Sequence, residues 1–567
     1  MQRKNWIYKQ LNIDSENLKK LSGSPIISTL LQNRGIYSQE EAKAYFSKPL
    51  ASIHSPFLFD GMEDACKRII SAISNNEKIV VYGDYDVDGI TSTALLYRFL
   101  KSQNANVSYY IPTRADEGYG INILALNKIA KAGTKLLITV DCGITAVGEV
   151  ECAKLQGIDT ILTDHHNCQE KIPGALAVIN PKLPDSDYPC SGLAGVGVAF
   201  KLALAIASKL SLKTSEVFSQ YSDLAAIGTI ADLVPLTDEN RIIVDRGLKK
   251  IISGGSFPGI CAMLKICKTE PENVTSDTIA FSIAPRLNAS GRLNSASHSV
   301  ELLLTDDYKK AEEIAIELDA ENLERRNTEQ EIFSQALDII ENDTEFNKKK
   351  VIVLNNEGWH QGVIGIVASR ICEKFYKPTI MISTEGIKGK GSGRSIPAFN
   401  LFNALEDASE HLSSFGGHSV AAGLNIKSSD IEAFKKHINA YADTCLTEED
   451  FLPTLKIDCE IPAKSVNLTN VRFLSNFEPF GMGNETPVFS MHGVELKSFS
   501  LIGADKKHLR LTILSDGLQF NCIGFNMRDF EKILVPGMHY NIAFTLGINT
   551  YQGKELIQLR LKDIQTL

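Results

Sequence analysis

Between residues 78 and 181 the sequence alternates between short apolar runs and longer amphipathic runs, and this alternation constrains the fold more than any other feature. The expected strands are 78–83, 106–112, 135–143, 159–166 and 175–181, and the helix patterns between them are 90–101, 121–133 and 145–157. Nearly continuous apolar strands that alternate with helices are typical of a parallel sheet with helices on both faces. We therefore predict an α/β fold for this region.

Changes of pattern along the 567 residues indicate further domains. A mostly helical stretch follows the predicted sheet, a second α/β pattern begins near residue 350, and short alternating runs typical of a small β-barrel begin near residue 451. We expect an N-terminal helical segment (1–50), a parallel-sheet α/β domain (51–300), an acidic helical connector (301–347), a second, smaller α/β domain (348–450) and a C-terminal barrel domain (451–567).

The net charge of −9 does not exclude a nucleic acid as a partner, because the acidity is local. Residues 301–345 hold fifteen Asp/Glu and four Lys/Arg, so their local net charge of −11 exceeds in magnitude the net charge of the whole chain. Basic surfaces are therefore possible elsewhere. No run of 18 apolar residues predicts a membrane span, and the N-terminus lacks the apolar core of a signal peptide. Eleven scattered cysteines without a CxxC motif favour a reducing cytoplasm over a disulfide framework or a zinc site.

Acidic and imidazole side chains follow the ends of several predicted strands. They are Asp84, Asp86, Asp88, Asp141, Asp164, His165 and His166, and Asp232 follows in the helical stretch. Ligands bind outside the carboxyl ends of parallel strands, so we expect these groups to converge. A single Asp here could equally be a helix N-cap or an Asx turn. The whole set, with oxygen and imidazole but no thiolate, suits two Mn²⁺ or Mg²⁺ ions that share a carboxylate and hydrolyse a phosphodiester.

Ten short motifs carry a resemblance to known proteins. DYDVDG (84–89), VDCG (140–143), TDHH (163–166) and ADLVPL (231–236) closely resemble, in order, the motifs of DHH-family phosphoesterases. The motifs EGYG (117–120), PRLNASGRL (285–293), GWHQGVIGIVASR (358–370), GSGRS (391–395), GGHSVAAG (416–423) and PFGMGNETPVF (479–489) resemble the RecJ family of bacterial single-strand-specific 5′→3′ DNA exonucleases. The match runs from about residue 45 to the C-terminus.

The resemblance implies a role for each residue of the acidic set. The implied metal ligands are Asp86, Asp88, Asp141, His165 and Asp232, with Asp141 bridging two ions of Mn²⁺ or Mg²⁺. Asp84 would join or support the site, His166 would meet the scissile phosphate, and Asp164 would orient a histidine. Tyr82 is a departure, because related enzymes often have histidine at that position.

A glycine-rich stretch in the second α/β pattern, GIKGKGSGRSIPAFN, carries Lys388, Lys390 and Arg394. Glycines let a backbone approach phosphate and guanidinium binds phosphate bidentately, although a flexible loop with solvated charges is an equal reading. The resemblance identifies this region as the DHHA1 domain and implies a pocket for a 5′-phosphate. The implied substrate-binding residues are Arg114, Arg286, Ser392, Arg394 and His418. We interpret GVG at 195–197 as helix packing, because no strand precedes it.

Four aromatic residues, Phe499, Phe520, Phe525 and Tyr551, are interleaved with basic residues in the C-terminal region. They suit base stacking in an OB-type groove, but for most of them a place in a barrel core is the stronger reading from composition. The resemblance predicts an OB-fold that binds nucleic acid.

The resemblance implies a 5′→3′ exonuclease that acts on single-stranded DNA in repair and recombination, and the scattered cysteines favour the cytoplasm. A single-strand-binding protein and a helicase are the implied partners, and no membrane association is expected. Two alternatives stay open. A DHH phosphodiesterase for oligoribonucleotides or cyclic dinucleotides would not require the β-rich domain, and a non-catalytic scaffold would not require the complete Asp/His set.

Overall fold

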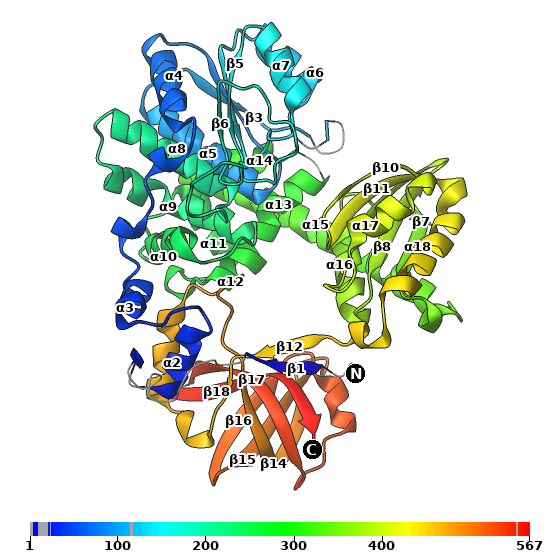
Figure 1. Ribbon diagram of the computed structural model, residues 1–567. Helices are drawn as coiled ribbons and strands as arrows, with labels where there is room; N and C mark the ends of the chain where they lie inside the picture. Colours follow the sequence, from blue (N-terminus) through cyan, green and yellow to red (C-terminus); the bar gives the residue numbers. More distant parts are fainter. Residues whose placement is uncertain are drawn as a thin grey trace. The chain divides into compact units, whose positions relative to one another are not determined.

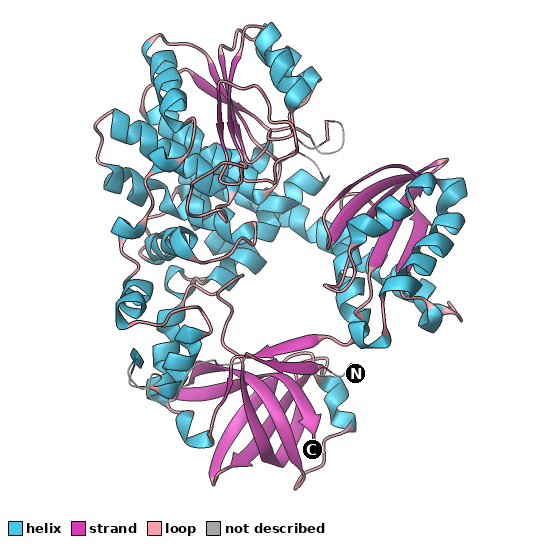
Figure 2. Cartoon of the chain, in the orientation of Figure 1, coloured by secondary structure: helices cyan, strands magenta, loops and turns pink. Residues whose placement is uncertain are grey.

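The computed structural model describes residues 4–9, 21–22, 24–113, 117–118, 120–293, 295–551 and 554–567 (Figures 1 and 2). The chain forms two compact units. One consists of Leu11–Asn322 and Val466–Pro487, and the other consists of Met1–Gln10, Leu323–Ser465 and Val488–Leu567. Within the described ranges, no helix has a stretch long and apolar enough to cross a membrane.

The unit that contains Leu11–Asn322 is built around a five-stranded parallel sheet, as the sequence predicts. Its strands, in spatial order, are β3 (Val107–Tyr110), β2 (Ile79–Tyr82), β4 (Leu136–Val140), β5 (Asp159–Thr163) and β6 (Ala177–Ile179). The chain passes from β2 to β3 on one side and then returns to β4 on the other side of β2. The carboxyl ends of β2 and β4 therefore flank the point where strand order reverses, which is where open α/β sheets bind ligands.

Helices cover both faces of this sheet because alternate strand residues point to opposite sides. Along β2, Ile79 and Val81 join one apolar cluster, and Val80 and Tyr82 join the other. The first cluster is closed by α4 (Met62–Ser74), α5 (Val87–Ser102) and α8 (Gly195–Lys209), and the second by α6 (Ile123–Lys131) and α7 (Val147–Leu155).

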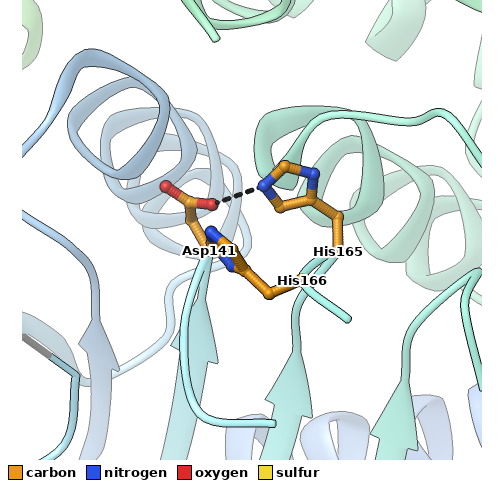
Figure 3. Close-up of side chains that lie close together, drawn as sticks. All are labelled: Asp141, His165 and His166. Carbon is orange, nitrogen blue, oxygen red and sulfur yellow. Dashed lines mark ion pairs between the residues drawn. The ribbon is translucent and has the colours of Figure 1, made fainter. Parts of the chain in front are cut away.

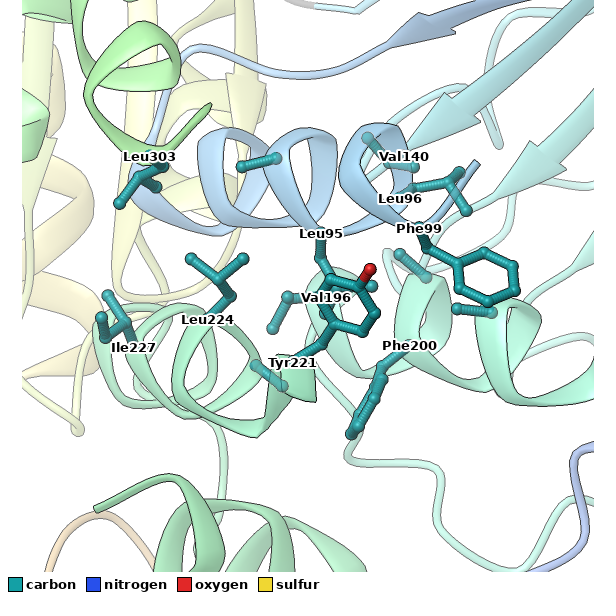
Figure 4. Close-up of a cluster of buried hydrophobic side chains, with 14 of the residues drawn as sticks. Leu95, Leu96, Phe99, Val140, Val196, Phe200, Tyr221, Leu224, Ile227 and Leu303 are labelled. Atoms are coloured by element: carbon teal, nitrogen blue, oxygen red, sulfur yellow. The ribbon is translucent and has the colours of Figure 1, made fainter. Parts of the chain in front are cut away.

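The larger cluster continues into the helical half of the unit. Figure 4 shows Leu95 and Phe99 of α5 beside Val196 and Phe200 of α8 and Tyr221 of the next helix. That helix, α9 (Thr214–Ala231), packs against both α5 and α8 and ends at Asp232. Among the described residues of this unit, the other helices of five residues or more that precede the acidic connector are α2 (Pro25–Gln32), α3 (Gln39–Ser47), α10 (Asp238–Ile252), α11 (Pro258–Ile266), the π-helix η4 (Ile279–Ile283), α13 (Ala284–Leu293) and α14 (Ser297–Leu304), and α19 (Leu468–Leu474) lies in the later segment.

The acidic connector is a single 34-residue helix, α15 (Tyr308–Glu341), that belongs partly to each unit. Its sparse apolar stripe is buried at Ile314, Leu318, Ile332 and Ile340, while most of its acidic side chains are exposed or half-buried.

The other unit contains a mixed sheet in the order β10 (Leu412–Gly417), β11 (Ala421–Lys427), β9 (Lys388–Arg394), β8 (Thr379–Glu385) and β7 (Ile352–Glu357). β7 and β8 are parallel, and the other pairs are antiparallel. The α-helices of this domain, among the described residues, are α16 (Ile364–Phe375), α17 (Leu401–Asp407) and α18 (Ile431–Cys445).

A closed five-stranded barrel completes the same unit. It consists of β14 (Phe489–Ile502), β15 (His508–Ser515), β16 (Leu518–Gly524), β18 (Lys554–Thr566) and β17 (His539–Tyr551), and β17 pairs back with β14. Phe489 and Phe544 fill its core. Phe499 and Phe520 are only half-buried and Phe525 is 57% exposed, so these three are not the core residues that composition favours. The side chain of Tyr551 lies outside the described residues.

Two short segments lie elsewhere than the pattern suggests. A strand, β1 (Asn5–Tyr8), interrupts the N-terminal segment expected to be helical, and it pairs in parallel with β12 (Thr454–Ile457). Residues 466–487 are grouped with the parallel-sheet unit, where Nη1 of Arg241 donates to the Phe477 carbonyl at 2.7 Å. A further short strand, β13 (Cys459–Glu460), pairs with β14.

Candidate metal centre and phosphate-binding residues

The turn after β2 places three carboxylates in different settings. Asp84 is buried, Asp86 caps α5 by accepting the Gly89 N–H at 3.1 Å, and Asp88 lies in the first turn of α5. The helix-cap reading of an aspartate in this motif is therefore correct for Asp86. Gly89 is required sterically, because a Cβ there would lie 2.5 Å from the Asp84 carbonyl oxygen.

Asp88 holds the start of α8 against this turn. Its two carboxylate oxygens accept the backbone N–H groups of Gly195 at 2.6 Å and Val196 at 2.8 Å, and the residue is 1% exposed. A Cβ at Gly195 would lie 2.5 Å from Oδ1 of Asp141. The GVG motif therefore brings a helix N-terminus against two carboxylates. Sequence reasoning assigned it to helix packing and missed this role, for which two glycines at the predicted start of a helix were the available signal.

Asp141 follows β4 with a left-handed backbone, φ 60°, which is uncommon for a residue with a Cβ but is tolerated by Asp. Asp164 follows β5, and its carboxylate accepts four hydrogen bonds, from the backbone N–H groups of Ile144, His165 and His166 and from Nδ1 of His166 at 2.7 Å. The structure thus brings Asp164 to the imidazole of His166 and fixes the orientation of that ring.

His165 points into a group of carboxylates contributed by different elements. Its Nε2 lies 3.1 Å from Oδ1 of Asp141 (Figure 3). The same nitrogen is 3.6 Å from Oδ2 of Asp232 and 3.8 Å from Oδ2 of Asp88. Asp232 reaches this group from the C-terminus of α9. Residues that are far apart in the sequence therefore meet at the carboxyl edge of the sheet.

Crowding shifts the protonation of these groups. Burial, reinforced by neighbouring aspartates, raises the pKa of Asp88 and Asp141 well above the usual range and raises the pKa of Asp232 to about 7. Burial and the adjacent His166 lower the pKa of His165 to about 3. This imidazole is therefore neutral at physiological pH and is able to coordinate a metal.

His166, the partner of Asp164, has a pKa shifted in the direction opposite to that of His165. Burial disfavours the charged form of His166, but the hydrogen bond and charge of Asp164 outweigh it and raise the pKa of His166. Burial likewise works against the charged form of Asp164, but the hydrogen bonds that it accepts keep its pKa below the usual value.

The donor set fits divalent cations. Three overlapping groups place their ligand atoms within 4.8 Å of one another: Asp84, Asp86 and Asp141; Asp141, His165 and His166; and Asp88, His165 and Asp232. Oδ1 of Asp141 is buried and has no well-aligned hydrogen bond from the described part of the chain. Carboxylates forced together in this way, with imidazole beside them, suit Mn²⁺ or Mg²⁺.

Tyr82 does not contribute to this edge through its hydroxyl. The hydroxyl donates to the Gly120 carbonyl at 3.0 Å, and the ring stacks on Tyr110 in the apolar cluster under α6 and α7.

Asn288 of the PRLNASGRL motif supports the turn that carries the three aspartates, because its Oδ1 accepts the N–H of Val87 at 3.1 Å.

The predicted substrate-binding residues fall in separate places. Arg114 lies outside the described residues. Arg286 pairs with Asp319 at 2.8 Å in the parallel-sheet unit, while Ser392 and Arg394 adjoin each other on β9, with Nη1 of Arg394 3.2 Å from Oγ of Ser392. His418 is exposed just after β10.

The glycine-rich stretch is a strand, which gives its glycines a different role from the expected one. Gly389, Gly391 and Gly393 are buried, and a Cβ on each would lie 2.7–3.0 Å from Leu401, Leu424 or Ile426. The side chains at 388, 390, 392 and 394 alternate with them and therefore share the opposite face. The glycines thus permit close packing on one face while the basic residues gather on the other.

The N-terminus of α16 covers the end of this polar face. A Cβ at Gly365, in the first turn of α16, would lie 2.8 Å from Oγ of Ser392 and 3.4 Å from Nη2 of Arg394. A helix N-terminus beside a guanidinium and a hydroxyl is a favourable setting for an anion.

Comparison with known proteins agrees with this geometry. Residues 78–229 match the DHH family N-terminal domain, 348–444 match the DHHA1 domain and 457–563 match the RecJ OB domain. The parallel sheet and its carboxylate-rich edge are thus those of a DHH-class protein with its associated domain.

Longer relatives identify the family. The single-stranded-DNA-specific exonuclease RecJ of Bacillus subtilis is 39% identical, covering 97% of this chain and 70% of the relative. The RecJ of Haemophilus influenzae is 35% identical, covering 96% of this chain and 97% of the relative. The crystal structure of RecJ with Mn²⁺ from Thermus thermophilus has a TM-score of 0.85 at 29% identity, covering 100% of this chain and 80% of that one. The chain belongs to the RecJ family of single-stranded-DNA-specific exonucleases.

Proposed function

We propose that this protein is a metal-dependent 5′→3′ exonuclease that hydrolyses single-stranded DNA in repair and recombination. The observation that carries the proposal is the convergence of three acidic and imidazole groups at the reversal point of a DHH-type sheet. Membership of the RecJ family supports single-stranded DNA as the substrate.

Two ions of Mn²⁺ or Mg²⁺ would be held by Asp84, Asp86, Asp88, Asp141, His165 and Asp232. RecJ structures from Thermus thermophilus are described with Mn²⁺ and with Mg²⁺, which supports this choice. When bound, such a pair of ions activates water and stabilises the leaving oxygen of a phosphodiester. Asp141 would bridge the two ions. It and His165 each belong to two of the three groups, and of these two only the carboxylate has two oxygens that can bind separate ions.

His166 would act on the scissile phosphate. Asp164 holds Nδ1 of the ring, so the other ring nitrogen, Nε2, is the atom for the substrate. Asp164 raises the pKa of His166 and so favours the protonated ring, in which Nε2 would donate a hydrogen bond to a phosphate oxygen.

Recognition of the 5′ end would rest on Ser392 and Arg394. A terminal phosphate carries more charge and more free oxygens than an internal one, and a guanidinium reads that difference better than a lone ammonium. The N-terminus of α16 beside these residues supports the assignment. The barrel would hold the strand further along, and a single-strand-binding protein and a helicase would supply single strands in the cytoplasm.

Digestion of single strands blocked at one end tests this proposal. With Mn²⁺ or Mg²⁺ we expect nucleotide release from strands with a blocked 3′ end and little release from strands with a blocked 5′ end. Removal of the metal with chelator should stop both reactions. Degradation from the 3′ end, or turnover of dinucleotides alone, would contradict the proposed function.

The contribution of Arg394 is tested on matched strands that carry a 5′-phosphate or a 5′-hydroxyl. We expect Arg394→Ala to lose most of the preference for the phosphate and Arg394→Lys to recover only part of it. An unchanged rate ratio in Arg394→Ala would place end recognition elsewhere.

A further inference from the structure

Two histidines and a glutamate meet in the DHHA1 domain, in the unit that does not hold the candidate metal centre. Glu410 and His411 lie in the short 3-10 helix η6 (Ser409–His411), and His437 lies on α18. Nε2 of His411 is 3.1 Å from Nδ1 of His437, and Oε1 of Glu410 is 3.5 Å from the first nitrogen and 3.4 Å from the second.

These three distances match the edges of a metal coordination tetrahedron. Imidazole nitrogens and carboxylate oxygens bind Zn²⁺ at about 2.0–2.1 Å, which places any two ligand atoms about 3.4 Å apart. The same three atoms form all three contacts, so one ion could touch each of them without a change of backbone. The side chains are accessible to an ion from solvent, because His411 is 21% exposed, His437 29% and Glu410 70%.

Asp407 provides the support that a metal-binding histidine usually has. Its Oδ2 lies 3.0 Å from Nε2 of His437, the ring nitrogen that faces away from the cluster. A carboxylate at this position makes Nε2 the protonated nitrogen and leaves the lone pair of Nδ1 directed at the cluster, which raises its strength as a ligand.

We propose that Glu410, His411 and His437 form a second metal site that takes Zn²⁺ or a similar transition metal, with Asp407 positioning His437. Two imidazoles and one carboxylate, with no other protein ligand among the described residues, differ from the carboxylate-rich centre in the other unit. Nitrogen-rich sites select Zn²⁺ over Mg²⁺ and Mn²⁺.

The ion would join two segments of the domain, η6 and α18, and Asp407 would connect the end of α17 to the second of them. Asp407 ends α17, His411 directly precedes β10, and His437 lies in the middle of α18. β10 is one of the two edge strands of the mixed sheet and ends in the glycine pair before His418. The competing account is a pair of histidines joined by a hydrogen bond without a metal, and it predicts no bound ion.

The Zn²⁺ content of the full-length protein after dialysis against buffered Zn²⁺ separates these accounts. We expect wild type to retain one Zn²⁺ per chain more than His437→Gln and one more than His411→Gln. His298→Gln is the matched control, since His298 is an exposed histidine with one carboxylate nearby, Glu321 at 3.9 Å, and no second histidine in the group. It should retain the wild-type content. Equal Zn²⁺ content in wild type, His437→Gln and His411→Gln would overturn the proposal.

Two further measurements test the coordination geometry of the ion and the positioning role of Asp407. Co²⁺ at this site should give the visible absorption of a four-coordinate ion in wild type and in His298→Gln, and the absorption should be lost in His437→Gln. Asp407→Asn should weaken Zn²⁺ binding by about 10–100-fold without removing a ligand. Unchanged Zn²⁺ affinity in Asp407→Asn would exclude its positioning role, and an unchanged Co²⁺ spectrum in His437→Gln would exclude the site.

Discussion

At the scale of the residue, Asp141 combines a left-handed backbone, near-complete burial and a carboxylate oxygen that lacks a well-aligned hydrogen bond among the described residues. We expect Asp141→Asn, which keeps the shape of the side chain, to lower the rate of strand cleavage by more than about 100-fold, since loss of a ligand should exceed the effect of losing a residue behind one. The measurement is the single-turnover rate at saturating Mn²⁺. Circular dichroism should be unchanged, and wild-type activity in this variant would refute the bridging role.

The raised carboxyl pKa values predict how metal binding depends on pH. Burial and Asp86 raise the pKa of Asp232 to about 7, and Asp88 and Asp141 are shifted upward as well. The metal-free centre therefore holds protons near neutral pH, and an ion must displace them. Affinity for Mn²⁺ should rise from pH 6 to pH 8, with proton release visible by calorimetry in buffers of different ionisation enthalpy. Asp232→Asn should flatten this rise, and a flat wild-type profile would contradict the assignment.

Tyr82 offers a test of a departure from the family pattern. Its hydroxyl donates a hydrogen bond to the Gly120 carbonyl. Tyr82→Phe should therefore lower the free energy of unfolding by about 1 kcal/mol and leave Mn²⁺ affinity unchanged. Denaturant unfolding and calorimetry measure the two quantities. A large loss of Mn²⁺ affinity would show that the tyrosine hydroxyl is a ligand of one of the metal ions.

At the scale of the element, the two faces of β9 should respond differently to substitution. A Cβ at Gly391 already comes within 2.8 Å of Leu424, so Gly391→Val should destabilise the protein by about 1–3 kcal/mol through overpacking. Lys390 is exposed and lies on the opposite face, so Lys390→Ala should leave stability nearly unchanged while weakening binding to single strands. Equal stability losses in the two variants would show that the glycines are not packing residues.

At the scale of the whole molecule, the barrel can be removed without disturbing the parallel-sheet unit only if residues 466–487 are kept. Arg241 donates to Phe477 in that segment, and Nε of Arg34 donates to Oδ1 of Asn484 at 2.6 Å. Deletion of 488–567 keeps this segment and removes the barrel. If the barrel binds nucleic acid, the deletion should weaken binding to long single strands more than it slows cleavage of short ones.

The dependence of that binding on salt provides the second readout. The slope of log affinity against log salt should be about −0.7 per neutralised phosphate, and the deletion should make it shallower. Unchanged affinity for long strands after the deletion would mean that the barrel does not bind nucleic acid.

The sequence by itself determined the class of each domain and the composition of the candidate centre. Apolar runs between helix patterns specify a parallel sheet, because strands buried on both faces need apolar residues at every position. The strand ends then place Asp84, Asp141 and His165 at one edge, because parallel strands share their direction. The family motifs extended this to the DHHA1 domain and the barrel.

Only the tertiary structure decided what each side chain does within those elements. Gly195 reaches Asp88 and Asp141 because α8 packs on the same face of the sheet as α5 with its N-terminus at the carboxyl ends of the strands, a contact between residues more than fifty positions apart. The glycines of β9 became packing residues because the stretch folds as a strand whose alternate positions face helix α17 and β11. His411 and His437 meet only when η6 packs on α18. Contacts of this kind depend on how elements pack, and neither spacing nor composition encodes that locally.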